Sequence, residues 1–437
     1  MRVAYLTAGA GGMYCGSCMR DNTLAAALIR QQRDVTLIPV YSPIRVDEPD
    51  VSTGRVYYGG INVFLQQKSA FFRHAPRVVD RLLDAPRLLE KAMRRAGSAR
   101  PDELGPLTLS ILRGAGGAQR KELDKLIDGL RDLSPDLIHL PNAMFVGLAR
   151  PLHEALGAAI ACTLTGEDIF LEALPQPYQE EAFALIRSAV SNVHGFIAVT
   201  RYYADYSRAR FGILEDRLHH VPMGIRIDYR NDPVATGHVT EGKDNARTFT
   251  IGYLARICPE KGLHVLCDAF ARLRESGRVA RLKIAGYLPS TRQAYLEQVM
   301  AELERRGHSA GVEVVGEVDR AGKANFLRSC DVVSVPTVYR EAKGLYVLEA
   351  MSYGVPVIQP AHGSFPELLD ASGGGVLFTP EAADELAAAI ARLMDEPSLR
   401  SELGEKGRRA VRERFTDEAM AHAAWDVLQK IRRAVVQ

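Results

Sequence analysis

The 437-residue sequence contains only six cysteines, one tryptophan and no long apolar run. Six cysteines are too few for the disulfide framework of a small secreted domain. No stretch approaches the roughly 18 apolar residues of a membrane span, and the N-terminal strand-like MRVAYLTA is too short for a secretion signal. The net charge is only +2, so no overall field favours nucleic acid as a partner. We therefore expect a globular cytoplasmic protein with reduced thiols.

Short β-branched runs alternate with amphipathic helical stretches along most of the chain. The predicted strands lie at 2–8, 34–39, 136–140, 159–164, 195–199 and 219–222, and then at 248–254, 281–286, 311–316, 331–336, 355–360 and 374–379. The predicted helices include 23–31, 119–132, 176–193 and 201–211. This alternation is typical of mostly parallel α/β sheets, and the chain is too long for one core. The sequence therefore predicts two successive doubly wound, Rossmann-like domains.

The boundary between these domains is predicted from a change in composition. Residues 227–246 are polar, contain Gly and Pro, and show no periodicity, so we interpret them as a linker. This interpretation gives a first domain at 1–226 and a second at 247–416. The last helix, at 417–437, follows the final strand of the second domain and can pack back on the first domain.

Residues 68–100 interrupt the alternation. The segment has a helical, amphipathic pattern, with nine Lys or Arg residues against three Asp or Glu. One interpretation is a solvated helical insertion. The other is a surface for an anionic acceptor or for an anionic membrane, which predicts peripheral contact with the inner face of a membrane.

The most informative motif is EAKGLYVLEAMSYGVPVI, which begins at Glu341 and has Glu349 inside a predicted helix opened by Gly344. First-turn amides, around Leu345 and Tyr346, have no intrahelical acceptor and suit an anion. A ligand with a phosphate there and hydroxyls near both carboxylates has the form of a nucleotide sugar. Taken alone, two glutamates that flank a helix start are usually solvated capping residues.

Two cations follow the predicted strand TFTIGYL. The sequence ARICPEKGLHVL places Arg256 and Lys261 in the turn before a helix. Two cations at the carboxyl end of a strand, beside a helix start, can hold a diphosphate. The alternative is an ordinary surface turn that ends in a Pro-Glu-Lys helix start.

Together these features resemble the family-four glycosyltransferases, retaining enzymes of the GT-B fold, over nearly the whole chain. The Arg-x4-Lys-Gly pattern after a strand, the paired glutamates and the GVPVI turn occur in the family's order and spacing. VPMGIRID and SPDLIHLPN also look like first-domain segments of the family. The resemblance implies two Rossmann-like domains that face a central cleft, with the acceptor bound by the N-terminal domain and the donor by the C-terminal domain.

The resemblance also implies roles for individual residues. Arg256 and Lys261 are expected to bind the leaving diphosphate. Glu349 is expected to hold the ribose hydroxyls and Glu341 the transferred sugar. The helix that opens at Gly344 completes the donor site with its first amides.

The loop GAGGMYCGSC after the first strand fits neither the dinucleotide fingerprint nor the P-loop. In the family, a glycine pair at this place lets backbone amides approach the donor phosphates, and Gly11 and Gly12 match it. Cys15 and Cys18 are then small residues that pack near the donor. A redox-sensitive pair and a metal site are the alternatives, although no second Cys-x-x-Cys pair exists to complete a structural zinc site.

One departure from the family concerns the segment ACTLTGEDIF. The family usually has a histidine after this strand, and the equivalent position here is Thr165. A hydroxyl cannot replace the imidazole in stabilising charge near the sugar. Glu167 and Asp168 are either contacts for acceptor or sugar, or an acidic pair that caps a helix.

The resemblance implies a retaining transfer of a hexose-type sugar from a nucleoside diphosphate sugar to an acceptor that is a lipid, a glycan or a small molecule. UDP is favoured only as the commonest donor nucleotide of the family. No Asp-x-Asp motif is present, so neither a metal nor another cofactor is expected. The alternatives are a nucleotide-sugar epimerase of the same fold and a non-catalytic regulatory subunit.

Overall fold

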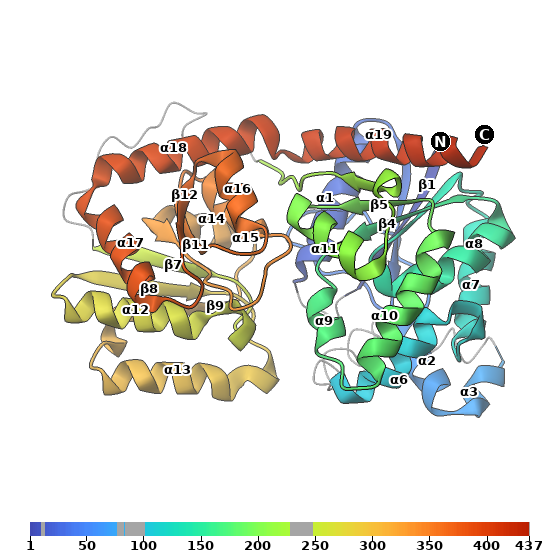
Figure 1. The fold of residues 1–437 in the computed structure, drawn as a ribbon, viewed down its shortest axis with the longest axis horizontal. Coiled ribbons are helices and arrows are strands. Elements are labelled where there is room, and N and C mark those ends of the chain that lie inside the picture. Colours follow the sequence, from blue (N-terminus) through green and yellow to red (C-terminus); the bar gives the residue numbers. More distant parts are fainter. Residues whose placement is uncertain (10–13, 77–82, 84–100, 228–247, 437) are drawn as a thin grey trace. The chain divides into compact units, whose positions relative to one another are not determined.

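The computed structural model describes residues 1–9, 14–76, 83, 101–227 and 248–436. The chain forms two compact units (Figure 1). Unit 1 comprises Met1–Met223 together with Glu418–Gln437, and unit 2 comprises Gly224–Asp417. Each unit contains one six-stranded sheet in which all paired strands are parallel.

Unit 1 has the strand order β2-β1-β3-β4-β5-β6. Its strands are β1 (Arg2–Ala8), β2 (Asp34–Val40), β3 (Leu137–Leu140), β4 (Ala159–Leu164), β5 (Gly195–Ala198) and β6 (Leu218–His220). Its helices are α1 (Gly16–Arg30), α2 (Gly60–Lys68), α3 (Ala70–His74), α6 (Pro101–Leu112), α7 (Arg120–Arg131), α8 (Ala149–Leu156), α9 (Asp168–Glu172), α10 (Tyr178–Ala189), α11 (Arg201–Phe211) and α19 (Asp417–Val436).

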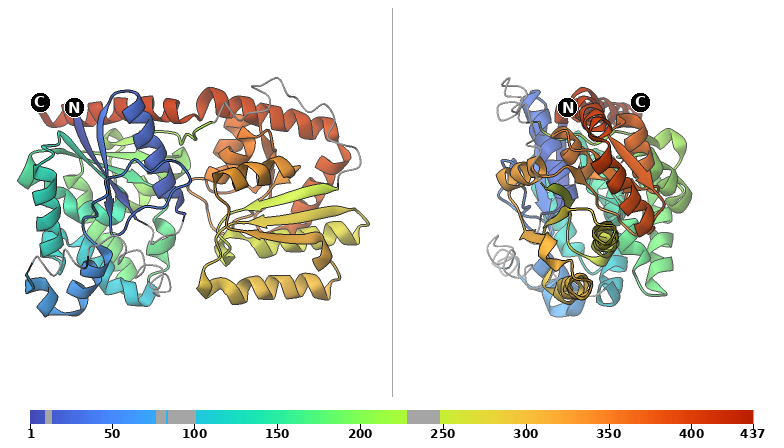
Figure 2. Two further views of the ribbon diagram at one scale, coloured as in Figure 1. Left: turned by 180° about the vertical axis from the view of Figure 1, so that it is seen from behind. Right: turned by 90° about the vertical axis from the view of Figure 1, so that its left-hand side faces the viewer.

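The C-terminal helix α19 packs on the sheet of unit 1 (Figure 2). Its Trp425, Leu428 and Ile431 belong to the same buried cluster as Val3 and Tyr5 of β1 and several residues of α1. The intervening β1 residues are equally buried on the opposite face, as expected for a parallel sheet covered on both sides. The first and last segments of the chain therefore share one core.

Unit 2 has the strand order β12-β11-β10-β7-β8-β9. Its strands are β7 (Phe249–Leu254), β8 (Ala280–Ala285), β9 (Val312–Gly316), β10 (Val332–Val333), β11 (Val357–Pro360) and β12 (Gly375–Phe378). Its helices are α12 (Leu263–Glu275), α13 (Gln293–Arg305), α14 (Arg320–Ser329), α15 (Leu345–Ser352), α16 (Phe365–Ser372), α17 (Ala383–Asp395) and α18 (Pro397–Arg414).

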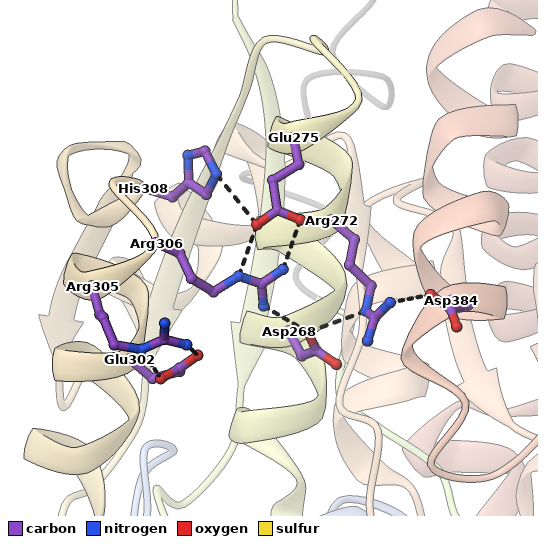
Figure 3. Close-up of polar contacts among 8 residues, drawn as sticks. All are labelled: Asp268, Arg272, Glu275, Glu302, Arg305, Arg306, His308 and Asp384. Carbon is purple, nitrogen blue, oxygen red and sulfur yellow. Dashed lines mark hydrogen bonds and ion pairs between the residues drawn. The ribbon is translucent and has the colours of Figure 1, made fainter.

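Ion pairs fix helix α12 against its neighbours (Figure 3). Arg306, which follows α13, contacts Asp268 at 2.7 Å and Glu275 at 2.9 Å, both on α12. Arg272 of α12 contacts Asp384 of α17 at 2.6 Å. Lys261, a predicted site residue, lies in the turn directly before α12.

All twelve predicted strands are confirmed, and so are the helices predicted near 119–132, 176–193 and 201–211. The first helix was predicted at 23–31 but begins at Gly16. Its first turn, Gly-Ser-Cys-Met, lacks the apolar periodicity of the later stretch LAAALI. The periodicity therefore predicted only the second half of the helix.

Two predicted segments lie largely outside the described residues. The linker at 227–246 is one, and most of the basic insertion at 68–100 is the other, so the insertion's membrane interpretation stays a prediction. Within the described part of the chain, none of the helices combines the length and apolar character needed to cross a bilayer.

Candidate functional site

The strand order of unit 2 defines where its site lies. From β7 the chain first adds β8 and β9 on one side and then returns to add β10, β11 and β12 on the other. In doubly wound sheets, ligands bind outside the carboxyl ends of the strands at such a switch point. The segment that follows β7 contains the predicted site residues Arg256 and Lys261, and the segment that follows β10 contains Glu341.

Lys261 is held by a tight turn. It ends the 3₁₀ turn Pro259–Lys261, and Gly262 follows with a φ of +69° before α12 begins. A Cβ atom on Gly262 would lie 1.7 Å from the carbonyl oxygen of Pro336, which follows β10. The amide of Val338 donates to the carbonyl of Glu260 at 3.1 Å. The two segments thus approach closely only because residue 262 is glycine.

Lys261 and Glu341 form an ion pair in which Nζ contacts Oε2. The Lys261 ammonium also donates to the hydroxyl of Tyr339 at 2.7 Å, and that hydroxyl donates to Glu341 at 2.7 Å. The rings of Tyr339 and Tyr346 lie within 5.1 and 5.2 Å of Nζ. Tyr339 was not singled out from the sequence, and only its position two residues before Glu341 could have suggested it.

The charge state of Glu341 follows from this network. Burial opposes ionisation, but the Lys261 charge and the hydrogen bonds from Lys261 and Tyr339 outweigh it and hold the pKa of Glu341 down to about 2. The carboxylate therefore accepts hydrogen bonds throughout the physiological pH range. Lys261 keeps 16% of its side chain exposed, so a ligand can still reach it.

Helix α15 begins beside this pair. Gly344 is its N-cap, with a φ of +72° that favours glycine, and Leu345 is the first helical residue. The first amides of the helix point away from its body and have no intrahelical acceptor. The Tyr346 hydroxyl lies 3.4 Å from Glu341 Oε2, so the helix start and the carboxylate belong to one cluster.

The remaining predicted residues of unit 2 are less closely grouped. Glu349 lies inside α15 and contacts Lys323 of α14 at 2.5 Å, with each side chain 15% exposed. Lys323 was missed because nothing in its surrounding sequence marks it. Arg256 follows β7 and its side chain is exposed, which leaves it accessible to an anion.

In unit 1, Gly11 and Gly12 lie outside the described residues. Beside the carboxyl half of β1, the structure instead shows a buried polar network that no sequence pattern indicates. Arg20 contacts Asp21 at 3.0 Å and donates to the hydroxyl of Tyr5 at 2.7 Å. Thr7 donates to Asp21 at 2.9 Å, and Tyr5 stacks on His139 with ring centroids 3.8 Å apart.

The acidic pair after β4 is also buried. The two oxygens of Glu167 accept the amides of Ala143 at 2.9 Å and Thr165 at 2.8 Å. Asp168 begins α9 beside the hydroxyl of Tyr203, and burial is the main cause that raises its pKa to about 6. Glu167 therefore orders two backbone segments, but its side chain does not cap α9, so the helix-capping interpretation is wrong for this residue. A contact of the pair with acceptor or sugar stays a prediction.

The two parallel sheets and the charged cluster at a switch point define a two-domain, doubly wound α/β protein. Two family models match the chain: Glycosyltransferase Family 4 at residues 90–229 and Glycosyl transferases group 1 at residues 240–410. The chain belongs to the family-four glycosyltransferases and has the GT-B fold.

Two of the relatives that match the chain are mannosyltransferases. The chain is 30% identical over 221 residues to the MMP alpha-(1->4)-mannosyltransferase of Mycolicibacterium hassiacum, covering 50% of each chain. It is 26% identical over 253 residues to the GDP-mannose-dependent alpha-(1-6)-phosphatidylinositol monomannoside mannosyltransferase of Mycobacterium tuberculosis, covering 56% of this chain and 64% of that protein. These matches thus span between half and two thirds of the relatives' lengths.

Solved structures support the fold alone. Sucrose-phosphate synthase from Thermosynechococcus elongatus superposes with a TM-score of 0.70 at 17% identity, covering 99% of this chain and 100% of that chain. Anabaena HepE, solved in complex with UDP, gives a TM-score of 0.67 at 16% identity, covering 98% of this chain and 100% of that chain.

Proposed function

We propose that this protein is a retaining glycosyltransferase that moves a hexose from a nucleoside diphosphate sugar to an acceptor. The observation that supports it most is the Lys261–Tyr339–Glu341 cluster beside the start of α15, at the switch point of unit 2. Membership of the family supports the reaction class. The cluster supports a donor with both an anionic group and hydroxyls.

In this proposal the diphosphate lies between the first amides of α15, at Leu345 and Tyr346, and the ammonium of Lys261, with Arg256 as a second cation. The diphosphate competes with Glu341 for Lys261, because both are anions that accept from the same ammonium. Glu341 then accepts hydrogen bonds from hydroxyls of the sugar, which an ionised carboxylate can do and a protonated one does poorly.

Glu349 is assigned to the ribose hydroxyls, with Lys323 holding its carboxylate. In the chemical step the departing phosphate oxygen takes the acceptor's proton on the same face of the sugar, and the configuration is retained. The task of the protein is then electrostatic: Lys261, Arg256 and the α15 amides neutralise the charge that develops on the diphosphate. Because two cations and a helix start supply this charge, we propose that no metal is needed.

GDP-mannose is the donor to test first. The names of relatives such as the Mycobacterium tuberculosis enzyme give GDP-mannose as the donor. UDP, by contrast, was predicted only because it is the commonest donor nucleotide of the family. HepE, which was solved with UDP, is too distant in sequence to indicate a donor.

The test is a thermal-shift screen with GDP-mannose, UDP-glucose and ADP-glucose, each with and without excess EDTA. A donor at 100 times its Kd should stabilise the protein by about 2.7 kcal/mol, and we expect GDP-mannose to do so with EDTA present. Turnover with the stabilising donor is then followed as release of nucleoside diphosphate. No stabilisation by any of the three would contradict the proposal, a new sugar epimer from donor alone would favour an epimerase, and binding without release would favour a regulatory subunit.

A further inference from the structure

Cys15 and Cys18 occupy distinct positions at the start of α1. Cys15 is the N-cap residue, with extended backbone angles (φ −115°, ψ 124°), and its side chain is partly exposed. Cys18 lies in the first turn and is fully buried. The two sulfurs are in the thiol form and in hydrogen-bonding contact. Cys15 is thus partly buried against the core of unit 1, and Cys18 is completely buried.

The helix N-terminus provides a favourable environment for a thiolate at the partly exposed Cys15. α1 has 15 residues, and its aligned peptide dipoles favour a negative charge at its first turn. The reactive form of cysteine is the thiolate, and a Cys-x-x-Cys pair at a helix N-terminus is an arrangement that promotes it. Cys15 is therefore placed to act as a nucleophile.

Cys18 has the opposite environment. Its thiol donates to the carbonyl of Ala8, the last residue of β1, at 2.6 Å. The hydrogen bond with Cys15 and then burial raise its pKa well above the usual value. Cys18 therefore keeps its proton until the Cys15 sulfur has become part of a disulfide that Cys18 can attack.

We propose that Cys15 and Cys18 form a reversible redox pair, in which Cys15 attacks an external disulfide and Cys18 closes an intramolecular disulfide. Small disulfides of the glutathione type are the oxidant. The Cys15 thiolate forms a mixed disulfide and releases one thiolate of the oxidant. Cys18 then loses its proton and attacks the Cys15 sulfur, which releases the second thiolate.

The reaction is balanced because two protein thiols are oxidised to one disulfide while the oxidant is reduced to two thiols. Closure removes the S–H group that donates to Ala8. The redox state therefore changes a hydrogen bond at the end of β1, directly before the glycine loop. This thiol chemistry goes beyond the proposed transferase activity and does not depend on it.

The four other cysteines provide an internal control. Cys162, Cys258, Cys267 and Cys330 are all buried, and the one among them that caps a helical turn, Cys258, precedes only the three-residue 3₁₀ turn Pro259–Lys261. Trypsin, which cuts after Arg2 and Arg20, places Cys15 and Cys18 together on the peptide 3–20, which contains no other cysteine. The oxidation of Cys15 and Cys18 can thus be measured separately from that of the other four cysteines.

The experiment equilibrates the full chain with mixtures of reduced and oxidised glutathione, quenches with acid, alkylates the remaining thiols and analyses the tryptic peptides by mass spectrometry. We expect peptide 3–20 to lose both alkylation sites together and to become lighter by about 2 Da than the reduced peptide. The four control cysteines should react at least about tenfold more slowly. A peptide 3–20 that keeps both alkylatable thiols in excess oxidised glutathione would overturn the proposal.

Two variants test the order of the steps. Cys18→Ser should accumulate glutathione on Cys15, because the second sulfur is missing. Cys15→Ser should leave Cys18 as a thiol, because Cys18 is buried. Equal oxidation of Cys18 in both wild type and Cys15→Ser would contradict the assigned roles, and the wild-type measurement stands even where a variant fails to fold.

Discussion

Each unit places an ion pair beside the first strand of its sheet, but the two pairs differ in their access to solvent. In unit 1, Arg20 and Asp21 have side chains only 1% and 4% exposed, and their partners are Tyr5 and Thr7 of β1. In unit 2, Lys261 is 16% exposed and stands between two loops at a switch point.

This difference in exposure indicates a structural role for the pair in unit 1 and a ligand-binding role for Lys261 in unit 2. Two atoms of the Arg20 guanidinium, Nε and Nη2, have no acceptor among the described residues, so the charge depends on Asp21 and Tyr5. Burial and the nearby Arg20 charge lower the pKa of His139 well below its usual value, so its ring stays neutral. The buried pair in unit 1 is suited to hold β1, β3 and α1 together. In unit 2 only Lys261 is partly exposed, whereas Glu341 is 5% exposed, so Lys261 is the member suited to exchange partners with a ligand.

The largest effect is expected from breaking the buried pair. Asp21→Ala leaves Arg20 charged and buried without its carboxylate, which costs about 3–5 kcal/mol. We expect a large loss of thermal stability in unit 1, measured by calorimetry. The matched control is Asp34→Ala, which removes the exposed Arg2–Asp34 pair of the same sheet and should cost about 1 kcal/mol or less. Equal melting points for the two variants would contradict the structural role of the buried network.

The next effect is on turnover. Lys261→Ala should raise the barrier to transfer by roughly 2–4 kcal/mol while changing donor affinity less, because the ammonium matters most as charge develops on the diphosphate. Steady-state kinetics of the folded variant measure this. Lys283→Ala, which removes a lysine paired with Glu313 on neighbouring strands of the same sheet, is the control and should keep wild-type kcat. An unchanged kcat in Lys261→Ala would refute the assignment.

A smaller, pH-dependent effect is expected at Asp168. Its pKa of about 6 in the folded protein exceeds the ordinary 3.8, so the folded state binds the proton more tightly than the unfolded state. The stability associated with this proton is complete below about pH 4 and is lost as pH rises through 6. Asp168→Asn should therefore increase the free energy of unfolding at pH 8 by up to about 3 kcal/mol, which raises the melting temperature. At pH 4 the substitution should change the melting temperature little. An equal shift at both pH values would show that ionisation is not the cause.

The sequence predicted unit 2 better than unit 1 for a physical reason. Arg256, Lys261 and Glu341 lie in short segments next to strand ends, where a local pattern indicates both the element and the edge of the sheet. The Arg20 network joins α1 to residues of β1 that lie 14 to 16 positions earlier and, through Tyr5, to His139 of β3. These contacts depend on how α1 packs on the sheet, so no local pattern reveals them. Lys323 was missed for the same reason, since its contact with Glu349 depends on how α14 packs beside α15.

The most direct test of the central claim is amide hydrogen exchange of the wild-type protein with GDP, and separately with UDP. We propose that the donor nucleotide binds at the switch point of unit 2, so the bound nucleotide should slow exchange in peptides that cover 255–263 and 337–349. The buried strand peptides of unit 1 around Tyr5 and His139 should exchange as they do without ligand. Protection that appears with bound nucleotide but spares both unit 2 segments would contradict the account.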